Sequence, residues 1–279
     1  PPLFVRVSGR ARFFPRPLWY RRFEYPEEAE RGFESHEDLF HPGLFELRIK
    51  KGEAVFFWAG TKAFDGNLKT KWEAEEKRRA RESLAARKTA KSLNLRHAED
   101  RRLMETLIRA GRQFLVIPPG RGPAVVAGYP WFGSWGRDTL ISLPGLTFCS
   151  GRPGWGAAVL REIGKYQNKG LLPNVVADNG EEAGFNAVDA SLWYFWAVQQ
   201  FLKYTGKIKI VRKDLWPVMQ SILRHYLAGT FHWIYAADNG LLHAGARDIQ
   251  LTWMDAAVGG IPVTPRSGFA VEINALWYN

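Results

Sequence analysis

The sequence has little of what several protein classes require. It holds one cysteine, Cys149, among 279 residues, so no disulfide can form within the chain, and a reduced, cytoplasmic compartment is the expectation. No run of about twenty apolar residues is present, so we expect no membrane-spanning helix and no membrane partner. The chain does not begin with methionine, and it ends in an apolar segment without a helix stop signal. We therefore expect an internal fragment of a longer protein.

Phosphate, metal and thiol chemistry are poorly supported as well. No glycine-rich loop leads into a Lys-Ser or Lys-Thr pair, as a phosphate-binding loop requires. The histidines at positions 225, 232 and 243 lack the spacing of metal ligands, and Cys149 has no nucleophilic setting. We expect a protein that needs neither a metal ion nor an organic cofactor.

Positive charge and aromatic side chains are abundant. The formal net charge is +11, and residues 69–111 carry more than half of it, with 13 Lys or Arg against 7 Asp or Glu. Glutamates interrupt this segment and aromatic residues do not alternate with its cations, so a solvated helical linker is favoured over a nucleic-acid-binding arm. The 12 Trp, 18 Phe and 9 Tyr indicate apolar platforms, either in a core or along a site for flat ligands such as sugars.

The first sixty residues are typical of β structure. Residues 45–49 and 54–58 alternate or are apolar around a turn at residues 50–53, which predicts a hairpin. Residues 25–43 are acidic and predict a loop. So few strands make a poor independent sheet, so we interpret residues 1–60 as the C-terminal part of a larger β domain.

The rest of the chain is typical of helices. Residues 61–112 form the basic linker, with an apolar stripe at Leu95, Leu103, Leu107 and Ile108. Short strands are expected at 114–117 and 124–128. Helices are then expected at 139–148, 155–167, 189–204 and, capped by Asp214, up to residue 227. Helix–break–helix units of about forty to fifty residues favour an α/α array.

Polar and aromatic residues gather in the loops that precede these helices. Trp135 stands among glycines and is followed by Arg137 and Asp138, a forked donor beside a carboxylate that could bridge two neighbouring sugar hydroxyls. The alternative is an N-cap aspartate with a surface arginine. Asn174, Asp189 and Trp193 form a second group, in which Asp189 is either a substrate-binding acid or a carboxylate favoured by the helix dipole.

Two further carboxyl groups occupy similar places. Asp255 lies beside Trp253 in an apolar run, and burial raises the pKa of a carboxyl group, as a general acid requires. The alternative is a buried aspartate satisfied by backbone N–H groups. Glu272 opens the last helix, as a cap or as a ligand to a hydroxyl. Glycoside hydrolysis uses two carboxyl groups, and Asp138, Asp189, Asp255 and Glu272 are the candidates.

These segments, in this order, resemble those of glycogen debranching enzymes of the prokaryotic amylo-α-1,6-glucosidase type. The similar segments are residues 135–139, 170–174, 188–193, 252–256 and 271–279, with residues 19–25 and 30–33 near the start. The resemblance implies a mainly α protein: the C-terminal end of a β-rich domain, then, over residues 113–279, the first half of an (α/α)6 barrel. It implies inverting hydrolysis of α-1,6-linked glucose in glycogen or a branched α-glucan.

The resemblance also implies roles for single residues. Asp255 matches the general acid, and Arg137 and Asp138 match the pair that holds the terminal glucose. Trp135, Asp189 and Glu272 would line the same pocket, with Asn174, Trp193 and Trp253 as further substrate contacts. The general base is expected beyond Asn279. Ser134 departs from the pattern, because an acidic residue is expected there.

Three rival hypotheses stay open. A glucoamylase-like or trehalase-like hydrolase of the same barrel type would differ in linkage preference. A glycan-binding protein without catalysis would show no turnover. A nucleic-acid binder would be retained on DNA in a salt-dependent way.

Overall fold

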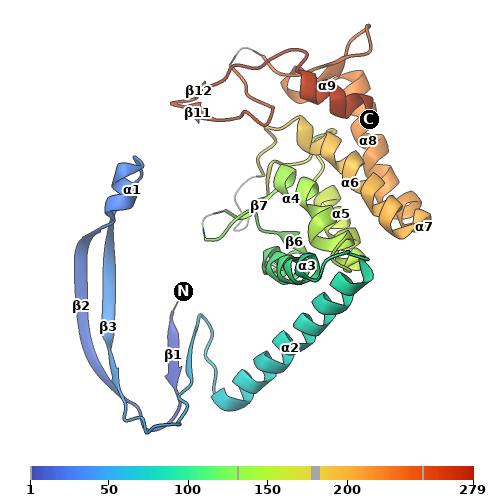
Figure 1. Ribbon diagram of the computed structural model, residues 1–279. Coiled ribbons are helices and arrows are strands. Elements are labelled where there is room, and N and C mark those ends of the chain that lie inside the picture. Colours follow the sequence, from blue (N-terminus) through green and yellow to red (C-terminus); the bar gives the residue numbers. More distant parts are fainter. Residues whose placement is uncertain (1, 131, 177–182, 247) are drawn as a thin grey trace. The chain divides into compact units, whose positions relative to one another are not determined.

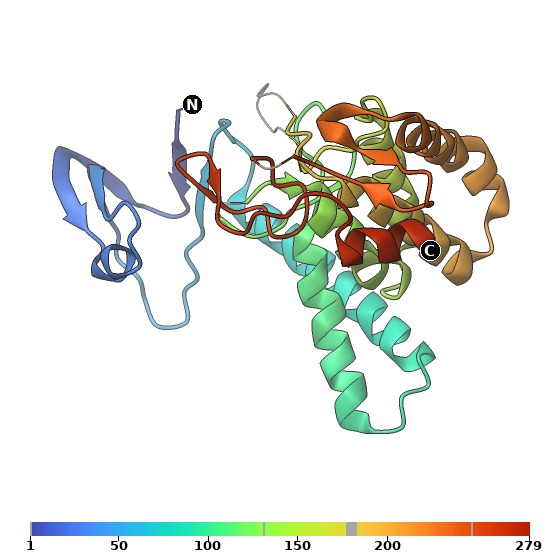
Figure 2. The same cartoon turned by 90° about the horizontal axis from the view of Figure 1, so that it is seen from above.

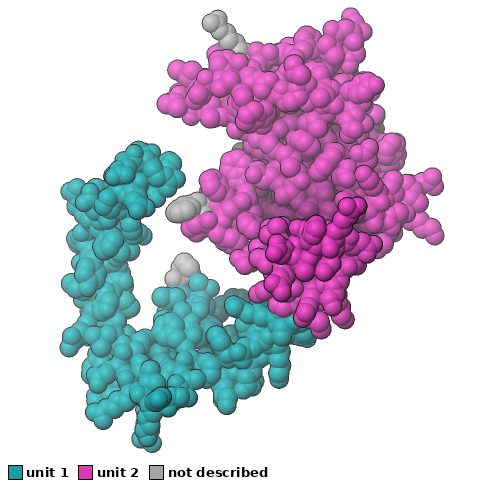
Figure 3. Space-filling model, in the orientation of Figure 1, with its two compact units in different colours: residues 1–81 teal, residues 82–279 magenta. Residues whose placement is uncertain are grey.

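The computed structural model describes residues 2–130, 132–176, 183–246 and 248–279. It forms two compact units, residues 1–81 and residues 82–279, shown in different colours in Figure 3. Helix α2 (Leu68–Ser92) contributes to both. In the described part of the chain, no helix combines the length and the apolar character needed to cross a membrane.

Unit 1 consists mainly of two antiparallel strand pairs (Figure 1). Its elements are β1 (Phe4–Val7), β2 (Arg12–Glu24), α1 (Pro26–Glu30), β3 (His36–Glu46) and β4 (Phe57–Gly60). Strand β1 pairs with β4, and β2 pairs with β3. Tilted aromatic rings make contact across the longer pair. The ring centroids of Trp19 and Phe40 are 5.0 Å apart, and those of Phe13 and Phe45 are 4.9 Å apart. Such cross-strand pairs stabilise the pairing of β2 with β3.

The predicted pairing of this region is wrong. No hairpin joins residues 45–49 to 54–58, since β3 ends at Glu46 and pairs with β2, while β4 pairs with β1. Most of the loop expected over residues 25–43 is α1 and β3. The acidic residues suggested a loop, but every second residue from Leu39 to Phe45 is partly buried, and this alternation is that of a strand.

Unit 2 is rich in helices, as the sequence predicts. The helices after α2 are α3 (Ala98–Gly111), α4 (Gly136–Leu143), α5 (Pro153–Lys165), α6 (Asp189–Thr205), α7 (Ile208–Ile210), α8 (Trp216–Ala228) and α9 (Val271–Tyr278). The paired strands are β5 (Leu115–Val116) with β6 (Ala124–Val125), β7 (Ser134–Trp135) with β8 (Val175–Val176), β9 (Tyr235–Ala236) with β10 (Leu242–His243), and β11 (Ala257–Val258) with β12 (Ile261–Pro262). Each pair is antiparallel and short, and these ribbons lie in the loops between helices.

Helix α6 lies at the centre of the core of unit 2. It contacts α4, α5, α8 and α9, and its Tyr194 and Phe201 are fully buried. The helix predicted over residues 189–204 is confirmed, and Gly206 ends it in the left-handed conformation, with φ of +63°. The helix predicted from residue 139 is confirmed as well. It begins at Gly136 and continues as a π-helical turn over Pro144–Phe148.

Two local predictions fail. Leu103 and Leu107 are more than half exposed, so the expected apolar stripe of α3 is reduced to Ile108, which packs on Ala86 and Ala90 of α2. Figure 2 shows the loop that joins α2, in cyan, to α3, in green. Residues 93–97 form a loop between α2 and α3, so the helical spacing that the stripe requires is interrupted there. Asp214 does not cap a helix but lies in a π-helical turn, Val211–Leu215, where it accepts a hydrogen bond from Arg161 at 2.7 Å.

We expect Tyr226→Phe to lower the free energy of unfolding by about 1–2 kcal/mol. Tyr226 is fully buried in α8, and its hydroxyl donates to the carbonyl oxygen of Val188 at 2.9 Å, directly before α6. Phenylalanine fills the same space but leaves that carbonyl without its donor. Urea denaturation of the wild type and the variant measures the change, and equal midpoints would contradict this account of the contact.

Candidate active site

The start of α4 is held by close backbone packing. Strand β7 leads into the helix and pairs with β8, and the Gly136 N–H donates to the Asn174 carbonyl oxygen at 2.7 Å. A Cβ atom on Gly136 would collide with the carbonyl oxygen of Pro173. Glycine is therefore required at this position, and the close approach fixes where the next residue, Arg137, begins.

Arg137 joins two carboxylates from distant parts of the sequence. Its Nε and Nη2 donate to the two oxygens of Asp189 at 2.6 and 2.9 Å. Its Nη1 donates to Oδ2 of Asp255 at 2.8 Å, and Nη2 also donates to the carbonyl oxygen of Thr252 at 3.1 Å. A planar guanidinium with two parallel bonds to one carboxylate is the best oriented of protein ion pairs.

Burial and charge act against each other in this cluster. The Asp189 side chain is 4% exposed, and burial raises its pKa while Arg137 opposes that shift. Burial works to lower the pKa of Arg137, but its hydrogen bonds and charge interactions with Asp189 and then Asp255 outweigh burial and raise it. Arg137 therefore stays a cation, and it compensates the charge of a buried carboxylate.

The surroundings of Asp255 differ from those predicted. The sequence predicts an apolar setting, but the polar neighbours of its carboxyl group are Arg137 and, at 3.4 Å from the same oxygen, Nδ2 of Asn174. The Asp255 side chain is 25% exposed, and the neighbouring Trp253 is 56% exposed. An apolar pattern in the sequence does not reveal that Trp253 is exposed.

Hydrogen bonds with α6 hold the segment that precedes Asn174. Ser191 in the first turn of α6 accepts a hydrogen bond from the Leu172 N–H at 2.8 Å and donates to the Gly170 carbonyl at 3.0 Å. The segment before Asn174 is thus tied to the helix that begins with Asp189. Asn174 itself is 1% exposed.

The other predicted residues lie outside these contacts. Asp138 is exposed and lines a cavity of about 360 Å³ together with Arg137 and Ile141. Trp135 is half-buried beside Phe132, and Trp193 is half-buried beside Trp196. Both carboxylate oxygens of Glu272 lie near nitrogens of Arg266, at 2.6 and 2.7 Å. Among the described residues, no hydrogen bond joins Asp138, Trp193 or Glu272 to the Arg137 cluster.

Sequence reasoning missed two parts of the site. The backbone carbonyl of Thr252 is an acceptor for Arg137, and no side-chain pattern reveals such a role. Gly136 permits the close packing of α4, and a glycine between two candidate site residues was the available signal. Within the described ranges, no group of three or more His, Cys, Asp or Glu residues could hold a metal ion.

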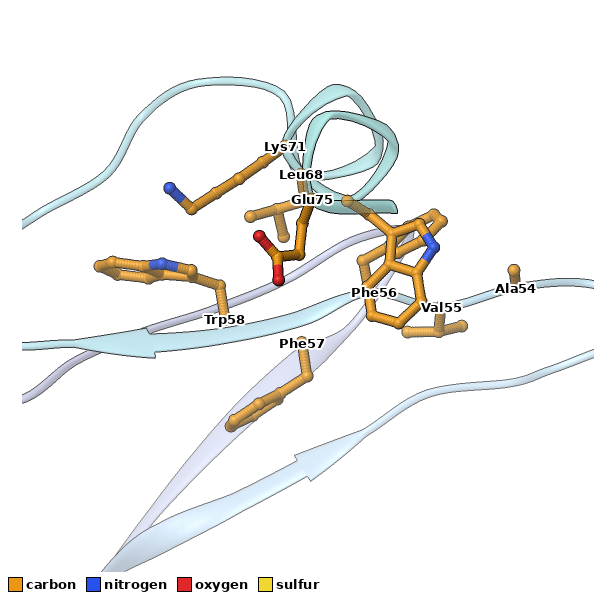
Figure 4. Close-up of a pocket in the computed structure, with 9 residues that line it drawn as sticks. Ala54, Val55, Phe56, Phe57, Trp58, Leu68, Lys71 and Glu75 are labelled. Atoms are coloured by element: carbon orange, nitrogen blue, oxygen red, sulfur yellow. The ribbon is translucent and has the colours of Figure 1, made fainter. Parts of the chain in front are cut away.

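A separate hollow lies within unit 1 (Figure 4). It has a volume of about 480 Å³ and is lined by apolar side chains such as Phe56, Trp58 and Leu68, with Lys71 and Glu75 on α2. Hydrogen bonds from Arg78 and then Arg79 lower the pKa of Glu75 to about 2. None of the predicted site residues lines this hollow.

Arg137 brings two carboxyl groups, those of Asp189 and Asp255, to one place in a helical domain. Glycoside hydrolysis is a chemistry that uses a pair of carboxyl groups. The family model described as amylo-alpha-1,6-glucosidase matches residues 109–279. The chain belongs to this family, as the resemblance of its motifs predicts. The model described as glycogen debranching enzyme N terminal matches residues 1–56.

A curated relative agrees with these matches. The chain is 28% identical over 221 residues to the glycogen debranching enzyme of Saccharomyces cerevisiae. The matched region covers 58% of this chain and 14% of the relative. The chain therefore spans a small part of the length of that protein.

Proposed function

We propose that this protein is a glycoside hydrolase that removes α-1,6-linked glucose from glycogen or a similar branched α-glucan. The observation that carries the proposal is the Arg137, Asp189 and Asp255 cluster, which lies within the residues that the amylo-alpha-1,6-glucosidase model matches. Cleavage needs no metal or organic cofactor, and a cytoplasmic location is part of the same proposal.

The proposed reaction uses Asp255 as the general acid. Its carboxyl proton passes to the glycosidic oxygen as the bond from that oxygen to the anomeric carbon breaks. Water attacks the anomeric carbon from the opposite face, and a second carboxylate accepts its proton, so the configuration inverts. Glu272 is a poor candidate for that base, because Arg266 holds both of its oxygens.

Residues around the cluster would hold the sugar. Asp138 is exposed beside Arg137 and can accept hydrogen bonds from hydroxyl groups, while the indoles of Trp135, Trp193 and Trp253 offer flat apolar faces. Residues 113–279 would contribute the first half of an (α/α)6 barrel, with the starts of α4 and α6 facing its cavity.

A comparison of substrates tests the proposal. The full-length protein is expected to release glucose from a limit dextrin with single-glucose branches at least about a hundredfold faster than from maltooligosaccharides or trehalose, because hydrogen-bonded sites discriminate strongly between hydroxyl arrangements. Faster release from maltooligosaccharides or trehalose would favour the glucoamylase-like or trehalase-like alternative. Binding without glucose release from any of them would favour a glycan-binding protein.

A further inference from the structure

The guanidinium of Arg137 is directed at carboxylates. Its bonds to Asp189, Asp255 and the Thr252 carbonyl use four of its five N–H groups: one on Nε, one on Nη1 and two on Nη2. A fork that bridges two neighbouring sugar hydroxyls needs two free parallel donors. Within the described part of the chain, Arg137 has one N–H left, so its contacts favour an action on Asp255.

Asp189 anchors Arg137 in a buried part of the domain. It is the first residue of α6, and the Val188 N–H just before it donates to the Leu251 carbonyl oxygen at 2.9 Å. This bond ties the start of α6 to the segment that carries Thr252 and Asp255. Asp189 and Asp255 therefore lie on two segments that this backbone hydrogen bond joins, and Arg137 binds both of their carboxylates.

The two oxygens of Asp255 have different surroundings. Both polar neighbours of the carboxyl group, Arg137 Nη1 at 2.8 Å and Asn174 Nδ2 at 3.4 Å, donate to Oδ2. Among the described residues, no hydrogen bond reaches Oδ1. An oxygen that accepts from a guanidinium is a poor place for an acidic proton, because its lone pairs are engaged. In the protonated carboxyl group, the hydrogen therefore belongs on Oδ1.

We propose that Arg137 and Asp189 are positioning residues that act through Asp255: they hold Oδ2 in place so that Oδ1 carries the proton to the glycosidic oxygen. This inference rests on the proposed function, since it needs Asp255 to be the acid. Neither residue transfers a proton itself. Asp189 fixes the plane of the guanidinium, and the guanidinium fixes the rotation of the Asp255 carboxyl group.

The experiment compares two substrates that need the acid to different degrees. A branched dextrin needs protonation of its leaving oxygen, whereas fluoride leaves α-glucosyl fluoride with little help. Arg137→Lys keeps a positive charge but loses the fork, and we expect it to lower kcat on the dextrin by about 30- to 100-fold and on the fluoride by less than about fivefold. A residue that binds glucose would show equal losses on both.

A second variant tests the anchor. Asp189→Asn keeps the shape of the side chain and is expected to show the same selective loss, about tenfold on the dextrin. In the double variant, the loss should not exceed that of Arg137→Lys alone, because both changes act on one property of Asp255. Independent, multiplying losses would contradict the inference. Since the readout is the ratio of the two rates, a lower amount of folded protein does not affect it.

Two controls separate this inference from the proposed function. Arg161→Lys changes an Arg–Asp pair of the same unit that lies outside the cluster, and both rates should stay within about twofold. Asp255→Asn tests whether Asp255 is the general acid. If this variant lowers kcat on both substrates equally, Asp255 is not the general acid. If Asp255→Asn is selective for the dextrin while Arg137→Lys and Asp189→Asn are not, the acid role stands and the positioning role is overturned.

Discussion

Asp255→Asn is expected to lower kcat on α-1,6-branched dextrin by about 10³- to 10⁴-fold, the upper part of the range for general acid catalysis. Asparagine keeps the size of the side chain and an oxygen for Arg137, but it has no carboxyl proton to give to the leaving oxygen. An assay of released glucose measures the loss of kcat. A calorimetric titration with the same dextrin measures binding, which should persist.

The contrast with an activated substrate sharpens this prediction. Hydrolysis of α-glucosyl fluoride should fall by much less, because fluoride departs without full protonation. A loss of only about tenfold on the dextrin would place the acid role elsewhere, and Asp189, the other carboxylate on Arg137, would be the next residue to change.

Gly136→Ala is expected to destabilise the fold by about 3 kcal/mol and to reduce glucose release from the dextrin by more than about a hundredfold. The added Cβ would meet the carbonyl oxygen of Pro173, a backbone atom that cannot rotate away. The start of α4 would have to move, and Arg137 would move with it away from Asp189 and Asp255. Thermal melting and glucose release measure the two effects.

Gly154→Ala is the matched control for that variant. Gly154 lies in the first turn of α5, and no atom lies within 4 Å of where its Cβ would be. Alanine there should stabilise the protein by about 0.5–1 kcal/mol, because it restricts the unfolded chain. If Gly136→Ala melts and turns over like Gly154→Ala, the close packing at Pro173 does not position the site.

The helices of unit 2 could be predicted because their apolar pattern is local. Residues 189–204 are apolar over several turns and are followed by Gly206, so both the helix and its end follow from the sequence. The pairing of β2 with β3 could not be predicted, because the acidic residues of β3 favour a loop in the sequence. The alternation of exposed and partly buried residues in β3 depends on its contacts with β2, such as the ring contact of Trp19 with Phe40.

The candidate site was predictable as a set of residues but not as a geometry. The motifs identified Arg137, Asp189 and Asp255. Asp189 lies 52 residues after Arg137 along the chain, and Asp255 lies 118 residues after Arg137. That Arg137 would bind both carboxylates depends on where Gly136 and the start of α6 lie in the folded domain. The sequence predicted a fork aimed at sugar hydroxyls, and tertiary packing directs that fork at Asp189.

The configuration of the first product tests the central claim most directly. Proton NMR of the full-length protein mixed with a branched dextrin distinguishes the anomers of glucose before they interconvert. An inverting acid and base mechanism predicts that β-glucose appears first and that the α anomer grows only by mutarotation. Glucose that appears first as the α anomer would contradict inversion, and the absence of released glucose would contradict the proposed hydrolysis.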